Sequence, residues 1–94
     1  MILSVEEVKV HLRIQHDEED GYIRDLIMQA QAAAEDYCRV TFPEDAPESV
    51  RLAVLLMTSH YYENRENSDN IAYATMRTAF QHLLYPHRDP EKMF

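Results

Sequence analysis

The sequence is poor in residues that build turns, with one glycine and four prolines among 94 residues. Folds made of many short strands need such residues at their connections, so this scarcity disfavours a strand-rich fold. Alanine, leucine, glutamate and glutamine, which favour helices, form the background instead. We therefore expect an all-α fold, a single domain with a small bundle of about four helices joined by short connections.

Thiols and long apolar runs are also scarce. The one cysteine, Cys38, cannot form an internal disulfide, which fits a reducing cytoplasm, and we interpret it as a small apolar residue on a helix. The N-terminus lacks the basic and apolar regions of a signal peptide. The longest continuous apolar run, residues 52–57, is far shorter than the roughly 20 residues that cross a bilayer. We expect a protein made in the cytoplasm, without a membrane anchor.

Positive charge is the third deficit, because nine Lys and Arg residues stand against seventeen Asp and Glu, for a formal charge of −8. Proteins that grip nucleic acid neutralise its phosphates with cations, so the sequence disfavours sequence-specific DNA binding. The same deficit argues against base stacking by Tyr61, Tyr62 and Tyr85. We assign these tyrosines to the core or to a protein interface.

Motifs of enzymes and metal sites are missing as well. Gly21 stands alone in a helix start, where it cannot form a phosphate loop, and no nucleophile elbow or Cys-His dyad is present. The acidic segment around His16 has the spacing of no calcium loop, and His60 with Glu63 supplies one reversed pair where di-metal bundles need two. We expect no catalytic residue, cofactor or metal, and a half-buried His60 bonded to a helix carbonyl.

Two helices are predicted in the first half of the chain. Ser4 and Glu7 form a capping box that starts a helix ending near Ile14. Asp17 stands where the N-cap of a second helix belongs, and that helix should run to about Arg39. The residues expected on the apolar faces are Val5, Val8 and Leu12, then Ile23, Leu26, Ile27, Ala30, Ala33, Ala34 and Tyr37, with Glu6, Lys9 and Arg13 in solvent.

Residues 47–66 predict a third helix that is apolar around almost its whole circumference. Its polar exceptions, Arg51, Thr58 and Arg65, recur every seven residues and so fall on one narrow stripe. Such a helix must be central and buried. Any part of its surface that the other helices leave uncovered should meet another copy or a partner.

The most polar stretch, residues 64–70, predicts the loop before a last helix. That helix should place Tyr73, Met76, Phe80, Leu83 and Leu84 on one face. Pro86 should end it and push Tyr85 out of helical geometry. We therefore divide the chain into a helical domain, residues 1–85, and an extended C-terminal tail, residues 86–94, which is either disordered or an arm that docks on a neighbour.

Three segments together resemble the head-tail connector, or adaptor, family of long-tailed double-stranded DNA bacteriophages. They are SVEEVKVHLRIQHDEED at the start, AVLLMTSHYYENRE in the middle and LLYPHR near the end. In that family a Gly-containing turn often follows the tyrosine that ends the second helix, where Cys38 and Arg39 stand here. The resemblance implies a structural virion protein without catalysis. It would form a ring below the portal at the head-tail junction and carry the next stopper or tail-completion protein.

The resemblance also gives the negative charge a role. About a dozen copies at −8 each would give a ring with of the order of 100 negative formal charges. These charges would repel phosphates and keep the duplex from sticking as it passes, without sequence-specific binding, over a screening length of about 8 to 10 Å. Assembly would take place in the host cytoplasm.

Two questions stay open at this point. The residues predicted to make protein contacts are Arg51, Arg65, Tyr85, Arg88 and Phe94, but both central-helix arginines have intramolecular pairing with the acidic first turns as an equal alternative. The alternative function is a small acidic helical protein-binding module of the antitoxin or anti-repressor type. Light scattering separates the two functions, because a binding module stays monomeric or dimeric whereas a connector forms, or is induced by its portal to form, large cyclic oligomers.

Overall fold

The computed structural model describes residues 1–64 and 70–89. These residues form four α-helices and one short 3-10 helix and contain no strand, which confirms the predicted all-α fold. The elements are α1 (Val5–Leu12), α2 (Asp20–Cys38), α3 (Glu48–Glu63), α4 (Asn70–Leu84) and the 3-10 helix η1 (Tyr85–His87). Within the described ranges, no helix has both the length and the apolar character needed to cross a membrane.

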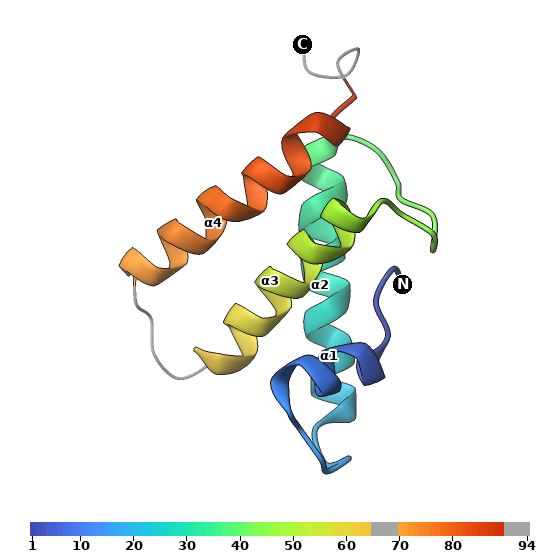
Figure 1. Cartoon of the computed structure of the whole chain (residues 1–94), viewed down its shortest axis with the longest axis vertical. Coiled ribbons are helices and arrows are strands. Elements are labelled where there is room, and N and C mark those ends of the chain that lie inside the picture. Colours follow the sequence, from blue (N-terminus) through green and yellow to red (C-terminus); the bar gives the residue numbers. More distant parts are fainter. Residues whose placement is uncertain (65–69, 90–94) are drawn as a thin grey trace.

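The helices form a flat slab with extents of 43 × 31 × 17 Å. Figure 1 shows α2 along the longest axis, with α3 and α4 running antiparallel to each other across it and α1 crossing near the start of α2. α3 packs against α1, α2 and α4 and makes the most extensive contacts of the fold, with α2 and α4, as predicted for the central helix. The connection between α2 and α3 and the outer side of α4 lie at opposite edges of the slab (Figure 1).

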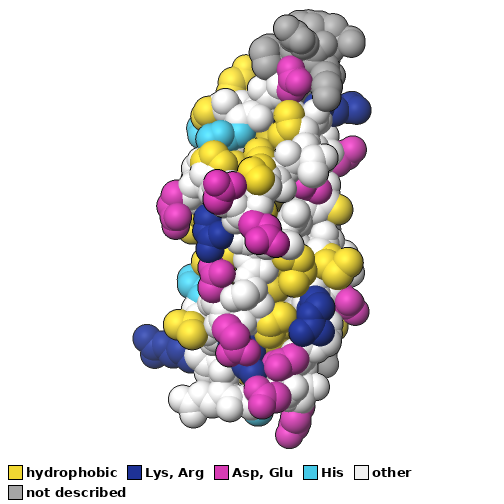
Figure 2. Space-filling model, turned by 90° about the vertical axis from the view of Figure 1, so that its right-hand side faces the viewer, with side chains coloured by type: hydrophobic (Ala, Val, Ile, Leu, Met, Phe, Trp, Pro, Cys, Tyr) yellow, Lys and Arg dark blue, Asp and Glu magenta, His cyan; other side chains and the backbone are white. Residues whose placement is uncertain are grey.

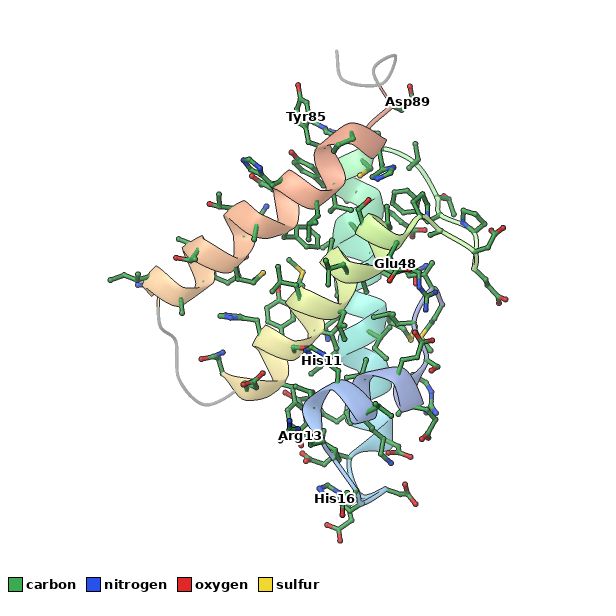
Figure 3. The ribbon with its side chains drawn as sticks, viewed as in Figure 1. His11, Arg13, His16, Glu48, Tyr85 and Asp89 are labelled. Carbon is green, nitrogen blue, oxygen red and sulfur yellow. The ribbon has the colours of Figure 1, made fainter. Side chains whose placement is uncertain are left out.

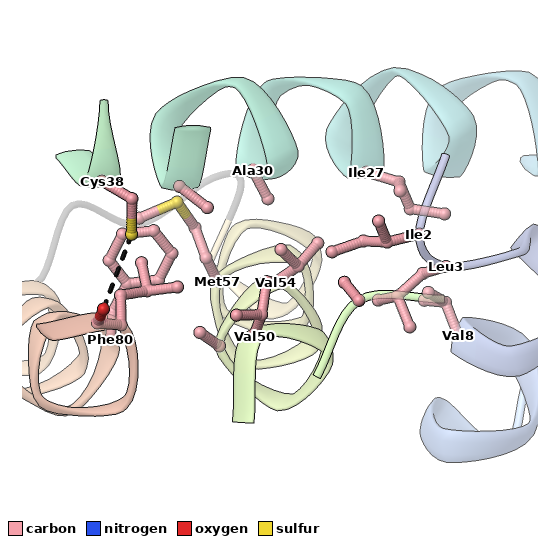
Figure 4. Packing of buried hydrophobic residues seen from close by; sticks show 14 of the residues in the cluster. Ile2, Leu3, Val8, Ile27, Ala30, Cys38, Val50, Val54, Met57 and Phe80 are labelled. Carbon is pink, nitrogen blue, oxygen red and sulfur yellow. Dashed lines mark hydrogen bonds between the residues drawn. The ribbon is translucent and has the colours of Figure 1, made fainter. Parts of the chain in front are cut away.

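The core lies between α2, α3 and α4 and extends under the N-terminal segment (Figure 4). Ala30 of α2 is fully buried and points toward Val54 of α3, so the small side chain lets these two helices approach closely. Phe80 of α4 fills the space beside Cys38 and Met57. Burying one such large apolar side chain stabilises the fold by roughly 1.5 to 3 kcal/mol.

α1 begins as the sequence predicts. The Glu7 amide donates to Ser4 Oγ at 3.0 Å and the Ser4 amide donates to Glu7 Oε1 at 3.3 Å, which completes the capping box. Leu3 and Val8, on either side of this cap, are both buried. The helix ends at Leu12, two residues before the predicted end, because the next residue adopts the left-handed conformation at φ 60°.

The connection from α1 to α2 differs from the prediction at two residues. Lys9, expected in solvent, is only 5% exposed, and its ammonium contacts Asp17 Oδ1 at 2.5 Å and Asp20 Oδ1 at 2.9 Å. Asp17 therefore does not cap α2, whose N-cap residue is Glu19 without a side-chain cap bond. The reason is position: α2 begins at Asp20, so Asp17 lies two residues before the N-cap, and its carboxylate contacts Lys9 instead.

The prediction of an exposed polar stripe on α3 was wrong for its middle residue, Thr58. Thr58 is fully buried, and its hydroxyl donates to the Val54 carbonyl at 2.7 Å, so the polar atom is satisfied within the helix. The exposed line of α3 passes instead through Leu52, which is 49% exposed, and the half-buried Leu56. Arg65, the third member of the stripe, lies outside the described residues.

α4 buries Met76, Phe80 and Leu84 as predicted, while Tyr73 is 36% exposed. Its end differs from the prediction, because helical backbone continues past Pro86 as η1 and becomes extended only at Arg88 (φ −71°, ψ 143°). Proline fits here, since the first turn of a new helix does not use its missing N–H. The Asp89 amide then donates to the Cys38 carbonyl at 3.0 Å. Residues 90–94 lie outside the described part, and the division at Tyr85 stays a prediction.

Candidate protein interface

The outer side of α4 differs in charge from the rest of the surface. None of the seventeen acidic residues lies between Asn70 and Arg88, and the one charged side chain of α4, Arg77, is cationic. The exposed residues opposite the buried face follow helical spacing. We call them the α4 face: Ile71, Ala74, Thr75, Thr78, Ala79 and His82. On a protein of charge −8, a whole helix side without a carboxylate indicates a contact surface rather than a solvated one.

Two shallow hollows follow this face and share Thr78 and His82. The first, of about 290 Å³, is lined by Tyr37, Thr78, Gln81, His82, Tyr85 and Pro86. The second, of about 630 Å³, is lined by Thr75, Thr78, Ala79, His82 and Leu83. The small side chains of the second hollow, Thr75, Thr78 and Ala79, allow another helix or loop to approach the α4 backbone closely. Both hollows are open, so they suit a protein surface rather than an enclosed small molecule.

The polar atoms of the α4 face are already satisfied in part. Thr75 donates its hydroxyl to the Ile71 carbonyl at 2.9 Å, and Thr78 donates to the Ala74 carbonyl at 3.0 Å. A hydroxyl that keeps its hydrogen bond when water leaves costs less to bury than one that loses its only partner. The threonines therefore oppose desolvation of this face less than their polarity indicates.

Two of the predicted contact residues lie at the C-terminal end of the face. Tyr85 is 66% exposed and projects from the end of the molecule (Figure 3). Arg88 is half-buried, with its guanidinium 4.6 Å from the centre of the Tyr37 ring and 5.9 Å from that of Tyr85. This cation–π stacking fixes Tyr85 beside α2. Arg88 Nε is buried and has no hydrogen-bond partner within residues 1–64 and 70–89.

The other predicted contact residues are placed differently. Arg51 donates to the Ile2 carbonyl at 2.5 Å, forms an ion pair with Glu7, and lies 4.0 Å from Glu48. The intramolecular pairing considered as its alternative is thus present, and it ties the N-terminal segment to α3. Arg65 and Phe94 lie outside the described residues. A contact role for these five residues stays a prediction.

The other tyrosines sort into core and surface. Tyr61 and Tyr62 pack half-buried against the core, and the Tyr62 hydroxyl donates to Glu19 Oε1 at 2.6 Å. Burial, followed by the neighbouring Tyr73, raises the pKa of the Tyr61 phenol. The Arg77 guanidinium donates to the Tyr73 hydroxyl at 3.2 Å, which holds this cation at the margin of the α4 face.

A serine–histidine pair comes together, with Ser49 Oγ 2.6 Å from His87 Nε2. In the part of the chain that the structure describes, no three His, Cys, Asp or Glu side chains converge as metal ligands. His60 is half-buried as predicted, but its ring meets the Asn64 side-chain amide at 3.4 Å rather than a carbonyl. Burial raises the pKa of the Cys38 thiol, whose sulfur lies 3.5 Å from the Leu84 carbonyl oxygen. This keeps the thiol in its unreactive form.

The sequence reasoning missed the α4 face itself. The sequence signal that could have identified this face is the run of 19 residues from Asn70 to Arg88, which contains no Asp or Glu.

The family model for phage gp6-like head-tail connector proteins matches residues 2–88. This match includes every helix of the structure. No curated protein and no solved structure matches the chain.

Proposed function

This chain belongs to the phage gp6-like head-tail connector family, and we propose that it forms a ring below the portal through which the phage DNA passes. Membership makes the chain a structural component of the virion. The ring, the DNA passage and the absence of catalysis are the proposal. The observation that carries it is the family match over residues 2–88.

Incomplete coverage of the central helix supports assembly into a larger structure. Leu52 of α3 is 49% exposed, and Leu55 and Leu56 beside it are only half-buried. In a chain of 94 residues the other three helices have too little surface to cover all sides of α3. Contacts with other virion proteins would bury the remainder, with the portal on one side of the ring and a stopper or tail-completion protein on the other.

Net charge supports the passage of DNA through the ring. At −8 for each subunit, the assembled ring repels phosphates, so the duplex is held by enclosure rather than by attraction. Acidic side chains are spread over the side of the slab with the α2–α3 connection (Figure 2), but the repulsion depends on the summed charge of all subunits and does not require this face to line the passage. Proteins that hold DNA by contact show the opposite sign.

Electron microscopy of the purified chain mixed with its portal protein tests this function. We expect closed rings of the chain, coaxial with the portal. A folded chain that neither binds the portal nor forms a closed oligomer would contradict the proposal. The same mixture tests the antitoxin-type alternative, since a binding module of that kind would stay monomeric or dimeric in the presence of the portal.

A further inference from the structure

We infer that the ring closes head to tail, with the α4 face of one subunit docked against the acidic α2–α3 connection of the next copy. This inference rests on the proposed ring and names the two surfaces that would form it. A ring requires two different surfaces that are complementary to each other, because an interface that pairs one patch with itself closes as a dimer.

The two surfaces lie at opposite edges of the slab. α4 forms one edge, and residues 39–47 with the start of α3 form the other (Figure 1). Figure 3 labels Glu48 at the second edge and Tyr85 near the C-terminal end of α4. With the contact surfaces on opposite flanks, each subunit can hold one neighbour on each side.

The charges of the two edges differ in sign. Glu44, Asp45 and Glu48 are all exposed at the connection, and Arg39 is the one exposed cation among residues 39–48, so this edge is acidic on balance. The only charged residues from Asn70 to Arg88 are Arg77 and Arg88. Two acidic edges would repel each other, whereas an acidic edge against α4 meets a helix that carries no carboxylate and has the cation Arg77. Charge complementarity therefore favours the second copy as the occupant of the α4 face.

Shape agrees with this pairing. The larger hollow on the α4 face is open and has small side chains at Thr75, Thr78 and Ala79. The opposite edge presents an irregular chain with Pro43 and Pro47 exposed, which is a convex element of restricted backbone freedom. Two prolines restrict the backbone of this protruding connection (Figure 1), so it loses less conformational entropy than an unrestricted loop when it enters a shallow groove.

Substitutions at Thr78 separate the effect of side-chain charge on ring formation from the effect of side-chain size. Thr78 is exposed, lines both hollows and donates its hydroxyl to the Ala74 carbonyl of its own helix, so its replacement leaves the core intact. Thr78→Glu and Thr78→Lys add side chains of similar length but opposite charge. In the presence of the portal, we expect Thr78→Glu to raise the concentration for half-maximal ring formation by about tenfold or more, while Thr78→Lys forms rings at least as well as the native chain.

The other edge is tested by Glu44→Lys combined with Asp45→Lys. Alone, this pair of substitutions should weaken ring formation, and together with Thr78→Glu it should restore it. The control for Thr78→Glu is Gln29→Glu, which adds a negative charge at an exposed position of α2 and should leave ring formation unchanged. Circular dichroism confirms that each variant is folded, and analytical ultracentrifugation with electron microscopy measures the rings.

Two outcomes would overturn the inference while leaving the ring in place. If the native chain forms rings and Thr78→Glu forms them equally well, the α4 face is not the contact. If Glu and Lys at position 78 block rings equally, or the combined variant shows no recovery, the acidic edge is not its partner. Absence of rings from the native chain itself would contradict the proposed function as well.

Discussion

The ammonium of Lys9 lies 2.5 Å from the carboxylate of Asp17, across the connection from α1 to α2. A second carboxylate, that of Asp20, lies 2.9 Å from the same nitrogen. These hydrogen bonds, Asp17 first, raise the pKa of Lys9 above its ordinary value of 10.5, and the bond from Lys9 lowers the pKa of Asp17 below 3.8. One nearly buried cation thus holds the turn that orients α1 against α2.

Replacing Lys9 by methionine should lower the stability of the protein. Methionine keeps the apolar stem but leaves the carboxylates of Asp17 and Asp20 close together without a cation between them. Thermal unfolding followed by circular dichroism should show a lower midpoint temperature. The matched control is Arg24→Met on the exposed side of α2, which should leave the midpoint nearly unchanged. Equal midpoints for the two variants would show that the Lys9 contacts contribute nothing.

Stability should depend on pH through the same pair. Because the pKa of Asp17 is lowered in the folded state, its contribution is present above the ordinary value of 3.8 and is lost as the pH falls through the folded value. For Lys9, whose pKa is raised, the contribution is complete below 10.5 and disappears only at still higher pH.

The difference in unfolding free energy between the native chain and Asp17→Asn measures this effect. It should be constant near neutral pH and shrink when the pH falls below about 4, which denaturant titrations at several pH values can follow. A difference that stays constant down to pH 2 would contradict the assigned shift.

Removing the Phe80 ring should destabilise the bundle strongly. The side chain is 2% exposed and fills the core between α4, Cys38 and Met57 (Figure 4). Phe80→Ala should cost about 3 to 5 kcal/mol, a large part of the roughly 5 to 15 kcal/mol that stabilise a typical domain. Urea denaturation measures this loss. Met28→Ala, at a position that is 54% exposed, should change stability by no more than about 0.5 kcal/mol.

Glycine at position 39 should stabilise the end of α2. Arg39 has φ 61°, a conformation in which a side chain is strained and glycine is not. Arg39→Gly should therefore raise the unfolding free energy by about 0.5 kcal/mol, after allowance for the greater freedom of glycine in the unfolded chain. Arg24→Gly, inside the same helix, should lower it by about 1 kcal/mol. A loss of stability in both variants would show that the Arg39 side chain contributes more than its strain costs.

The sequence predicted the features that depend on local chemistry. The capping box at Ser4, the apolar stripe of α2 through Ala30 and the buried face of α4 through Phe80 all follow from residue spacing within one helix. The resemblance to connector proteins rested on such segments in their order, and the family match agrees with it.

The features that the sequence did not reveal depend on contacts between elements. Lys9 meets carboxylates eight and eleven residues away because the chain turns back between α1 and α2, and no periodic pattern encodes that turn. Thr58 can be buried at low cost because its hydroxyl donates a hydrogen bond to the Val54 carbonyl of its own helix. In the candidate interface, Tyr85 was identified by its place before proline, whereas the α4 face could have been found only from the missing carboxylates.

The enclosure of Cys38 has a practical consequence for mapping neighbours in an assembled particle. Its sulfur is packed inside the fold against the Leu84 carbonyl, and the chain contains no other thiol. A cysteine introduced at any surface position would be the one site that fluorophores or bifunctional linkers reach in the folded state. The native cysteine therefore need not be removed before thiol labelling of the folded protein.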